Sequence, residues 1–297
     1  MGIKKLLVAN RGEIAVRIIL AAQELGIKTV QVHSAADADM LAVKMADEAV
    51  LIGPPAAAKS YLKIDAILDA ARATGADAVH PGYGFLAENA DFADAVVAAG
   101  MVWVGPAGDA IRTMGDKVAA RVAAQSAGVP VVPGSDGRVD DFEAARAIAE
   151  RIGFPVMIKA AAGGGGRGIR IAQDMEEFDR LLPQASAEAK AAFGDGGLYL
   201  EKVIERARHI EVQVLGDGTR AIHCFERECS LQRRRQKVWE EAPSAALPQA
   251  MREKLCASAV ALAEAVGYKG AGTLEYLFDD ASGQFYFIEM NTRIQVE

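Results

Sequence analysis

The residues that could do chemistry begin with a run of glycines between two short apolar segments. Val156–Lys159 ends in a lysine, Gly163–Gly166 follow, and Gly168–Ile171 is the second apolar run. Two strand-like runs joined by glycines predict a β-hairpin, and backbone N–H groups at a glycine tip can approach an anion without obstruction. With positive charge from Lys159 and Arg167, the hairpin is expected to form a flap over the phosphates of a nucleotide. The alternative is a solvent-exposed turn. The P-loop and the dinucleotide fingerprint do not fit, because these glycines join strand to strand.

A second set of polar residues alternates along the last stretch of the chain. If residues 289–297 stay extended, alternate side chains share a face, and the polar face then holds Glu289, Asn291, Arg293, Gln295 and Glu297 opposite Met290, Ile294 and Val296. A hairpin through residues 279–283 brings Glu275 near Glu289 and Asn291. Two carboxylates and an amide oxygen suit Mg²⁺. Together with Lys159 and the flap they indicate phosphoryl transfer, and the alternative is a solvated sheet edge.

Two further charged segments are candidates for the same site. Alternation over residues 209–214 places His209, Glu211 and Gln213 on a polar face, opposite apolar residues that build a core. The run Arg233–Lys237 is of a kind that often marks a solvated face or a nucleic-acid patch. Because it is short and the protein is acidic, we interpret it as an anion-binding segment inside a cleft.

Short apolar runs alternate with helical patterns in the first hundred residues. Strands are expected at 3–8, 29–33, 49–52, 76–80 and 101–104, and helices at 12–25, 61–74 and 91–99. This alternation predicts an open, mostly parallel α/β sheet with helices on both faces. The tight turns at 9–12 and 80–84 follow strands, at the sheet edge where ligands bind. His80 itself is expected to be structural.

The remainder predicts an α+β arrangement with its own small lid. We expect one long helix over 109–127, a junction at 128–135, a helix over 140–152, the glycine hairpin, and a helix opened by a capping box of Asp174 and Glu177. Strands are then expected at 198–204, 209–215, 221–226, 272–279 and 284–291, with a helix at 249–266. We therefore divide the chain into an α/β domain, residues 1–115, and a second domain, residues 116–297, with its lid at about 130–203.

Composition excludes several classes of protein. The 297 residues carry a net charge of −7, which argues against general nucleic-acid binding. The three cysteines contain no CxxC pair and suit a reducing compartment. No stretch is long enough for a membrane span or a signal peptide. These features predict a cytoplasmic protein with no membrane partner.

Seven stretches together resemble the biotin carboxylase component of biotin-dependent carboxylases, a branch of the ATP-grasp superfamily. They are Val8–Arg17, His80–Leu86, Met114–Lys117, Lys159 with its glycine loop, Glu226–Ser230, Gln232–Pro243 and Phe287–Glu297. The resemblance covers the whole chain. It implies an N-terminal α/β domain followed by an ATP-grasp fold with a lid.

The resemblance also implies a role for individual residues. ATP phosphates would contact Lys117, Lys159, Gly165 and Gly166, adenine would be read by the hinge Glu201, Lys202, Val203 and Ile204, and the rest of the nucleotide site would include His209, Gln232, Arg235 and Glu275. Glu275, Glu289 and Asn291 match ligands of Mg²⁺ or Mn²⁺, and Lys237, Arg293 and Val296 match a bicarbonate site. Glu297 matches the base that deprotonates bicarbonate, and Arg293 the arginine that stabilises the biotin enolate. Arg235 departs from the family, which often has His or Asn there.

The activity that this resemblance implies is a ligase reaction forming a C–N bond. ATP and bicarbonate give carboxyphosphate, which carboxylates biotin on a biotin carboxyl carrier, and a carboxyltransferase subunit then uses the product in an acyl-CoA carboxylase. The alternatives are another bicarbonate-activating ATP-grasp ligase, such as a carbamoyl-phosphate-synthetase-like protein, and a non-catalytic ATP-binding module. Relatives continue beyond Glu297, so we expect a longer protein that forms a homodimer or larger assembly. A chain of residues 1–297 alone is expected to keep some nucleotide affinity without carboxylating biotin.

Overall fold

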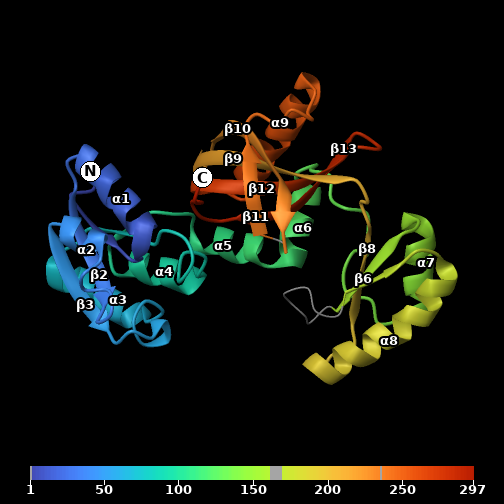
Figure 1. Ribbon diagram of the computed structural model, residues 1–297, viewed down its shortest axis with the longest axis horizontal. Helices are drawn as coiled ribbons and strands as arrows, with labels where there is room; N and C mark the ends of the chain where they lie inside the picture. The colour runs from blue at the N-terminus through green and yellow to red at the C-terminus, as the bar shows by residue number, and fades with distance from the viewer. Residues whose placement is uncertain (1, 161–168, 235) are drawn as a thin grey trace. The chain divides into compact units, whose positions relative to one another are not determined.

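The first hundred residues form an open five-stranded parallel sheet. The computed structural model describes residues 2–160, 169–234 and 236–297. The strands are β1 (Lys5–Val8), β2 (Lys28–Ser34), β3 (Glu48–Gly53), β4 (Ala78–His80) and β5 (Val102–Trp103), in the order β3-β2-β1-β4-β5. Each was expected from the sequence. Figure 1 labels β2 and β3 of this sheet. The order reverses beside β1, so β1 and β4 flank the switch point at which ligands bind in such sheets.

Helices cover both faces of this sheet because β1 alternates its side chains between two cores. Leu6 and Val8 pack with Ile14 of one core, whereas Leu7 belongs to a second core with Phe92. The first core includes α1 (Gly12–Glu24) and α2 (Leu41–Met45), and the second includes α3 (Ile64–Thr74) and α4 (Ala90–Ala98). A 3-10 turn, η1 (Ala57–Lys59), precedes α3. The doubly covered α/β sheet is confirmed.

The turn after β1 holds the turn after β4. The Asn10 side chain donates to the backbone carbonyls of Pro81 and Tyr83, both at 2.7 Å. Gly82 has φ +65°, and a Cβ there would lie 2.8 Å from the Asn10 amide nitrogen, so the close approach requires glycine. Gly82 N–H also donates to Nδ1 of His80 at 3.0 Å. His80 thus acts as a structural acceptor, as expected.

Residues 109–127 form two helices, so the prediction of one long helix is wrong. α5 (Gly108–Gly115) ends before Asp116, and α6 (Lys117–Ser126) begins after it. Asp116 is extended at φ −87°, ψ 119°, and its side chain accepts from the N–H groups of Val118 and Ala119. The carboxylate caps a new helix N-terminus, which competes successfully with continuation of the first helix.

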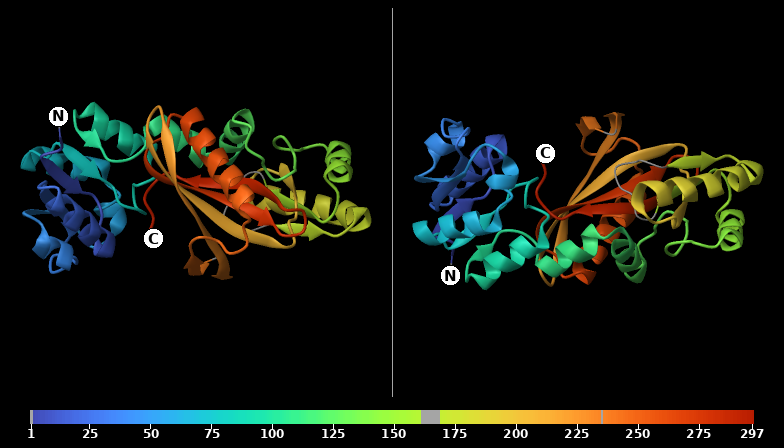
Figure 2. Two further views of the ribbon diagram at one scale, coloured as in Figure 1. Left: turned by 90° about the horizontal axis from the view of Figure 1, so that it is seen from above. Right: turned by 90° about the horizontal axis from the view of Figure 1, so that it is seen from below.

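A smaller sheet carries the predicted hairpin. β6 (Val156–Ala160) pairs antiparallel with both β7 (Arg170–Ala172) and β8 (Leu198–Lys202). α7 (Phe142–Ile152) and α8 (Met175–Phe193) share its apolar core, and Figure 2 shows α8 running beside these strands. The capping box is present: Asp174 accepts from Glu177 N–H, and Glu177 accepts from Gln173 N–H. The tip of the predicted flap lies outside the described residues.

The last third forms a five-stranded sheet in the order β11-β10-β9-β12-β13. Its strands are β9 (Ala207–Asp217), β10 (Ala221–Arg233), β11 (Gln236–Glu241), β12 (Lys269–Asp279) and β13 (Gln284–Asn291), and α9 (Gln249–Ala265) packs on β10. The longer β10 and the whole of β11 were not predicted, because their arginine-rich and exposed residues lack an apolar alternation.

The chain divides into two compact units. Unit 1 is Met1–Val129, Ile210–Tyr276 and Glu289–Glu297, and unit 2 is Pro130–His209 and Leu277–Ile288. The predicted lid, 130–203, falls within unit 2, whereas the boundary at 115/116 stays a prediction. Among the described residues, no helix combines the length and apolar character needed to span a membrane.

Candidate active site

Unit 1 contains a pocket of about 770 Å³ beside the turn that follows β4, residues 80–84, which we call the switch-point turn. The turn after β4 contributes Tyr83, Gly84 and Glu88, and β11 contributes Gln236, Lys237 and Glu240. The remaining walls are Glu275, Asn291, Arg293, Gln295, Val296 and Glu297. The structure therefore brings together six of the residues that the sequence proposed for metal, bicarbonate and catalysis.

A network of ion pairs forms one wall of this pocket. Glu211 on β9 is fully buried, and it pairs with Arg227 Nη2 at 2.7 Å and with Lys237 Nζ. Lys237 also lies 3.4 Å from Glu275 and 3.8 Å from Glu297. A buried carboxylate is tolerated only when it is paired. The lysine is therefore held by acids with its Nζ in the pocket wall, where it can attract a small anion.

Arg293 is the second cation of the pocket. Its Nε donates to Glu88 at 3.0 Å, and its Nη2 donates to the Asn291 side-chain oxygen at 3.1 Å. Asn291 in turn donates to Glu275 at 2.7 Å. A guanidinium fixed on one side by such bonds presents its remaining donors in a defined direction, which suits a planar anion such as bicarbonate.

The chain end is tied down by a residue from the first recognised motif. Arg17 on α1 donates to the carbonyl of Gln295 at 2.8 Å and to that of Val296 at 3.3 Å. Gln295 is only 6% exposed, and its side-chain nitrogen lacks a hydrogen-bond partner among the described residues. A buried amide donor in the pocket wall is costly unless something accepts from it. The sequence placed Gln295 on the polar face but did not assign it to the anion site.

The predicted extended face over residues 289–297 needs a correction. β13 ends at Asn291, so strict alternation stops there. Val296, predicted to lie opposite the polar residues, is 67% exposed and lines the pocket with them. Glu289 is exposed and lies outside the pocket lining, while Ile294 packs against the core that contains α1. After Asn291 the chain leaves the sheet and passes close to Glu88, which follows the turn after β4. A two-residue periodicity describes a continuous strand, so it does not predict this path.

The donor set for a metal ion fits by chemistry. Glu275, which is 7% exposed, accepts from the side-chain nitrogen of Asn291, and Glu289 lies two residues before Asn291 on β13. The possible ligands are the carboxylate oxygens of the two glutamates and the amide oxygen of Asn291. Hard oxygen ligands of this kind suit Mg²⁺ or Mn²⁺. The Asn291 oxygen accepts from Arg293 here, so a metal ion would have to take over that oxygen.

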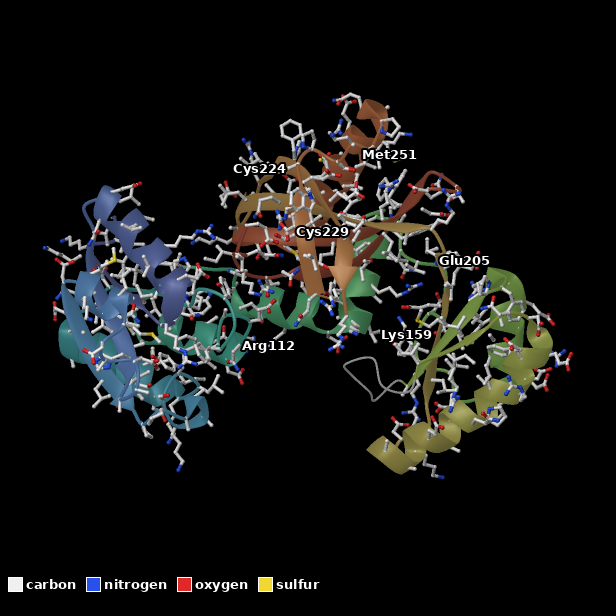
Figure 3. All side chains as sticks on the ribbon, in the orientation of Figure 1. Arg112, Lys159, Glu205, Cys224, Cys229 and Met251 are labelled. Atoms are coloured by element: carbon white, nitrogen blue, oxygen red, sulfur yellow. The ribbon has the colours of Figure 1, made fainter. Side chains whose placement is uncertain are left out.

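An ion pair joins two of the nucleotide residues expected in unit 2. Lys159 on β6 pairs with Glu201 on β8 (Figure 3 labels Lys159). The backbone N–H of Lys202 donates to Pro133 and that of Val203 donates to Pro155. The role of residues 201–204 in reading adenine stays a prediction. His209, half-buried on β9, is the last residue of the first segment of this unit.

The remaining candidates are partly accounted for. Lys117 is exposed at the first position of α6, and Gln232 on β10 donates to the Cys229 carbonyl at 3.0 Å. Gly165, Gly166 and Arg235 lie outside the described residues.

Cys229 is excluded as a nucleophile despite its position near the pocket. It is fully buried on β10, where Figure 3 labels it. Burial and the nearby Glu240 carboxylate raise the pKa of its thiol to about 12. Since the thiolate is the reactive form, Cys229 stays inert at neutral pH.

Comparison with known families identifies both parts of the chain. Residues 2–111 match the family described as "Biotin carboxylase, N-terminal domain". Residues 116–297 match the family described as "Carbamoyl-phosphate synthase L chain, ATP binding domain".

Curated relatives and solved structures carry the same name. The chain is 55% identical to biotin carboxylase of Pseudomonas aeruginosa over 99% of this chain and 66% of the relative, and 55% identical to biotin carboxylase 1 of Bacillus subtilis over the same shares. It thus spans about two thirds of the length of these relatives.

Among solved structures, a biotin carboxylase β,γ-ATP complex from Campylobacter jejuni matches with TM-score 0.88 and 49% identity, over 100% of this chain and 66% of the other. The bicarbonate-bound biotin carboxylase domain of a thermophilic 2-oxoglutarate carboxylase matches with TM-score 0.93 and 48% identity, over 100% and 65%. The chain therefore belongs to the biotin carboxylase family, with an ATP-grasp fold after its N-terminal α/β domain.

Proposed function

We propose that this protein carboxylates biotin with bicarbonate at the expense of ATP, through carboxyphosphate. The observation that carries the proposal is the pocket itself. It gathers two cations, Lys237 and Arg293, and the carboxylate of Glu297 around one cavity. Gln295 adds an amide donor that has no partner within the described part of the chain. A small anion with one removable proton fits this combination of donors and base.

The residues of the pocket account for the first step. Bicarbonate would bind between Lys237, Arg293 and the backbone and side chain of Gln295 and Val296. Glu297 would take the bicarbonate proton, so that the oxygen can attack the γ-phosphate of ATP. Lys237 and Arg293 neutralise the charge that collects on carboxyphosphate, at fixed positions that need little reorganisation.

The biotin step uses the same cations. Carboxyphosphate would collapse to CO₂ and phosphate, the phosphate would accept the ureido proton of biotin, and Arg293 would stabilise the resulting enolate. Because the pocket also includes Tyr83 and Gly84 of the switch-point turn, biotin is expected to enter along that wall.

Nucleotide and metal binding are assigned to the surrounding residues. Phosphates would contact Lys117, Lys159, Gly165 and Gly166, and adenine and ribose the segment 201–204 with His209, Gln232 and Arg235. Glu275, Glu289 and Asn291 would hold Mg²⁺ or Mn²⁺, which supplies charge neutralisation to the phosphates when bound. All of these residues fall in the proposed ATP-grasp domain, 116–297, with its lid at about 130–203. The proposed N-terminal domain, 1–115, contributes Tyr83, Gly84 and Glu88 to the pocket.

Partners and location follow from the same proposal. Biotin would be presented on a carboxyl carrier protein or domain, and a carboxyltransferase would consume carboxybiotin. A homodimer is supported by a relative described as a biotin carboxylase domain dimer from Hydrogenobacter thermophilus, 51% identical with TM-score 0.86. A cytoplasmic location stays a prediction from the sequence.

A second candidate is a carbamoyl-phosphate-synthetase-like ligase, because the family matched by residues 116–297 bears that name. Both candidates activate bicarbonate with ATP, and only the first needs biotin. The discriminating experiment measures ADP release by the full-length protein with bicarbonate or biotin omitted in turn. Dependence on both supports biotin carboxylation. Dependence on bicarbonate alone, with carbamate formed from added ammonia, would favour the second candidate, and dependence on neither would reject both.

A further inference from the structure

We propose that Glu240 is the second carboxylate of a proton-holding pair with Glu297. In this pair Glu297 takes the proton of bicarbonate, and Glu240 is the member that releases a proton to water. This inference rests on the proposed function and adds to it a residue for which neither the motifs nor the alternation of strand residues gave a role.

A β-bulge places Glu240 in the pocket. On β11, Lys237 pairs with Gln232, and Trp239 pairs with the adjacent Leu231. Between these two pairs β11 runs over two residue steps and β10 over one, so Val238 is the extra residue of a bulge. The bulge shifts the alternation by one position and turns Glu240 to the side of Lys237. Exposure agrees, because Val238 and Trp239 are 67% and 62% exposed, while Lys237 and Glu240 both line the pocket.

The two carboxylates meet beside a shared cation. The Glu240 and Glu297 side chains both line the pocket, and both lie beside Arg227. Arg227 Nη2 lies 3.6 Å from Glu297, and Arg227 Nε lies 3.9 Å from Glu240. Two ionised carboxylates that share one cation repel each other. A proton held by one of the pair would relieve this repulsion.

The charge balance of the network indicates where that proton lies. In the ion pairs of the described residues, two cations, Arg227 and Lys237, contact four acids: Glu211, Glu240, Glu275 and Glu297. Glu211 is paired directly with both cations, and Glu275 is within 3.4 Å of Lys237 and accepts from Asn291. Within the described part of the chain, the nearest cation to Glu240 is the 3.9 Å contact with Arg227. Glu240 is the least compensated of the four.

The charged groups that act on the titration of Glu240 are Glu297, Lys237 and Arg227. The thiol of Cys229 lies nearby. Burial and the charge of Glu297 raise the pKa of Glu240, and the two cations oppose this only in part. Like charges that share a site disfavour the ionisation of both groups at once, which favours a proton on Glu240.

Proton transfer through the pair balances without any further reagent. In the resting pair one proton lies between the two carboxylates. The bicarbonate O–H bond breaks, its electron pair stays on the oxygen that attacks the γ-phosphorus, and the bond from phosphorus to ADP breaks. The proton joins Glu297, so the pair holds two. Glu240, whose side chain is 25% exposed, then loses its own proton to water.

The test compares Glu240→Gln with the matched control Glu241→Gln in the full-length protein. Glu241 is the next residue of the same strand, and it is exposed and outside the pocket lining. Infrared titration of the protein without substrates should show a protonated carboxyl that persists above the ordinary range of glutamic acid. We expect this band to be lost in Glu240→Gln and kept in Glu241→Gln.

The kinetic arm measures bicarbonate-dependent ADP release against pH. For Glu240→Gln we expect kcat to fall by about tenfold or more, with the KM for ATP nearly unchanged and the shape of the kcat–pH profile altered. Glu240→Asp should restore part of the activity. A persistent carboxyl band, or an unchanged pH profile, in Glu240→Gln overturns the pair. If the parent protein shows no ADP release that depends on bicarbonate and biotin, the proposed function fails, and the infrared titration still decides whether the pair exists.

Discussion

Lys237 Nζ and the fully buried carboxylate of Glu211 form an ion pair at the edge of the pocket. Glu211 also pairs with Arg227, so the lysine is fixed by an acid that cannot reach water. This arrangement fixes the position of a cation at the pocket. If the lysine is removed, the buried carboxylate of Glu211 keeps its ion pair with Arg227.

Lys237→Gln should separate bicarbonate chemistry from nucleotide binding. We expect the loss of a charge-assisted contact to cost about 2–4 kcal/mol of transition-state stabilisation, a hundredfold or more in bicarbonate-dependent turnover. ATP affinity, measured by calorimetry, should change little, because the lysines proposed to hold the phosphates are Lys117 and Lys159. Lys254→Gln, on the exposed side of α9, serves as the control. A collapse of ATP affinity with normal bicarbonate dependence would assign Lys237 to the nucleotide site instead.

Glu289→Gln should nearly abolish ATP turnover. A neutral amide in place of the carboxylate weakens Mg²⁺ binding and leaves phosphate charge uncompensated. The comparison is Glu143→Gln, an exposed acid in the first turn of α7. The measurement is ADP release as a function of Mg²⁺ concentration, and turnover equal to that of the parent at low Mg²⁺ would contradict the assignment of Glu289 as a ligand.

Asp116→Ala should loosen the first turn of α6. The lost cap costs about 1 kcal/mol, so the amides of Val118 and Ala119, which Asp116 accepts from, should exchange about fivefold faster with solvent. Asp116→Asn retains an oxygen acceptor and should exchange almost as slowly as the parent. Equal exchange in the parent and the alanine variant would show that the turn is held by other contacts.

His80 should make the N-terminal domain less stable in acid. Desolvation by the surrounding protein, with the charge of Arg17, lowers the pKa of His80 from 6.5 to about 4. The unfolded chain therefore binds a proton that the folded chain does not, so the stabilisation is complete above about pH 6.5 and is lost as the pH falls toward 4. At pH 5 the loss amounts to about 2 kcal/mol.

The measurement uses urea unfolding at pH 7 and pH 5 in a Trp239→Phe background, where buried Trp103 reports on the first sheet. His80→Asn keeps an acceptor for Gly82 N–H but cannot titrate. Its stability should change less between the two pH values than that of the parent. An equal change in both would assign the acid sensitivity to other groups.

Local patterns predicted most of the fold. The alternation of apolar and polar residues indicated β13 with its observed ends, Gln284–Asn291, and the capping box at Asp174 is present as expected. The pattern failed where a side chain competed with the regular structure. Asp116 interrupts an otherwise continuous helical pattern by capping the backbone, and β11 forms from exposed and charged residues that pair with β10.

The candidate site, like the fold, could be predicted only in part from the sequence. Residue types and the family resemblance indicated Lys237, Glu275, Asn291, Arg293 and Glu297, all of which line the pocket. Glu240 depends on a bulge at Val238, and Gln295 on the path of the chain after β13. Periodicity placed Gln295 on the polar face of residues 289–297 without giving it a role. It could not indicate Glu240, because the bulge between β10 and β11 shifts the alternation by one position.

The most direct measurement of the central claim follows an oxygen atom. The full-length protein is incubated with ATP, biotin and bicarbonate labelled with ¹⁸O, and the mass of the released inorganic phosphate is determined. Attack of bicarbonate on the γ-phosphate predicts that one labelled oxygen per turnover appears in the phosphate. Unlabelled phosphate, formed at the same rate, would mean that water attacks ATP and would contradict the carboxyphosphate mechanism.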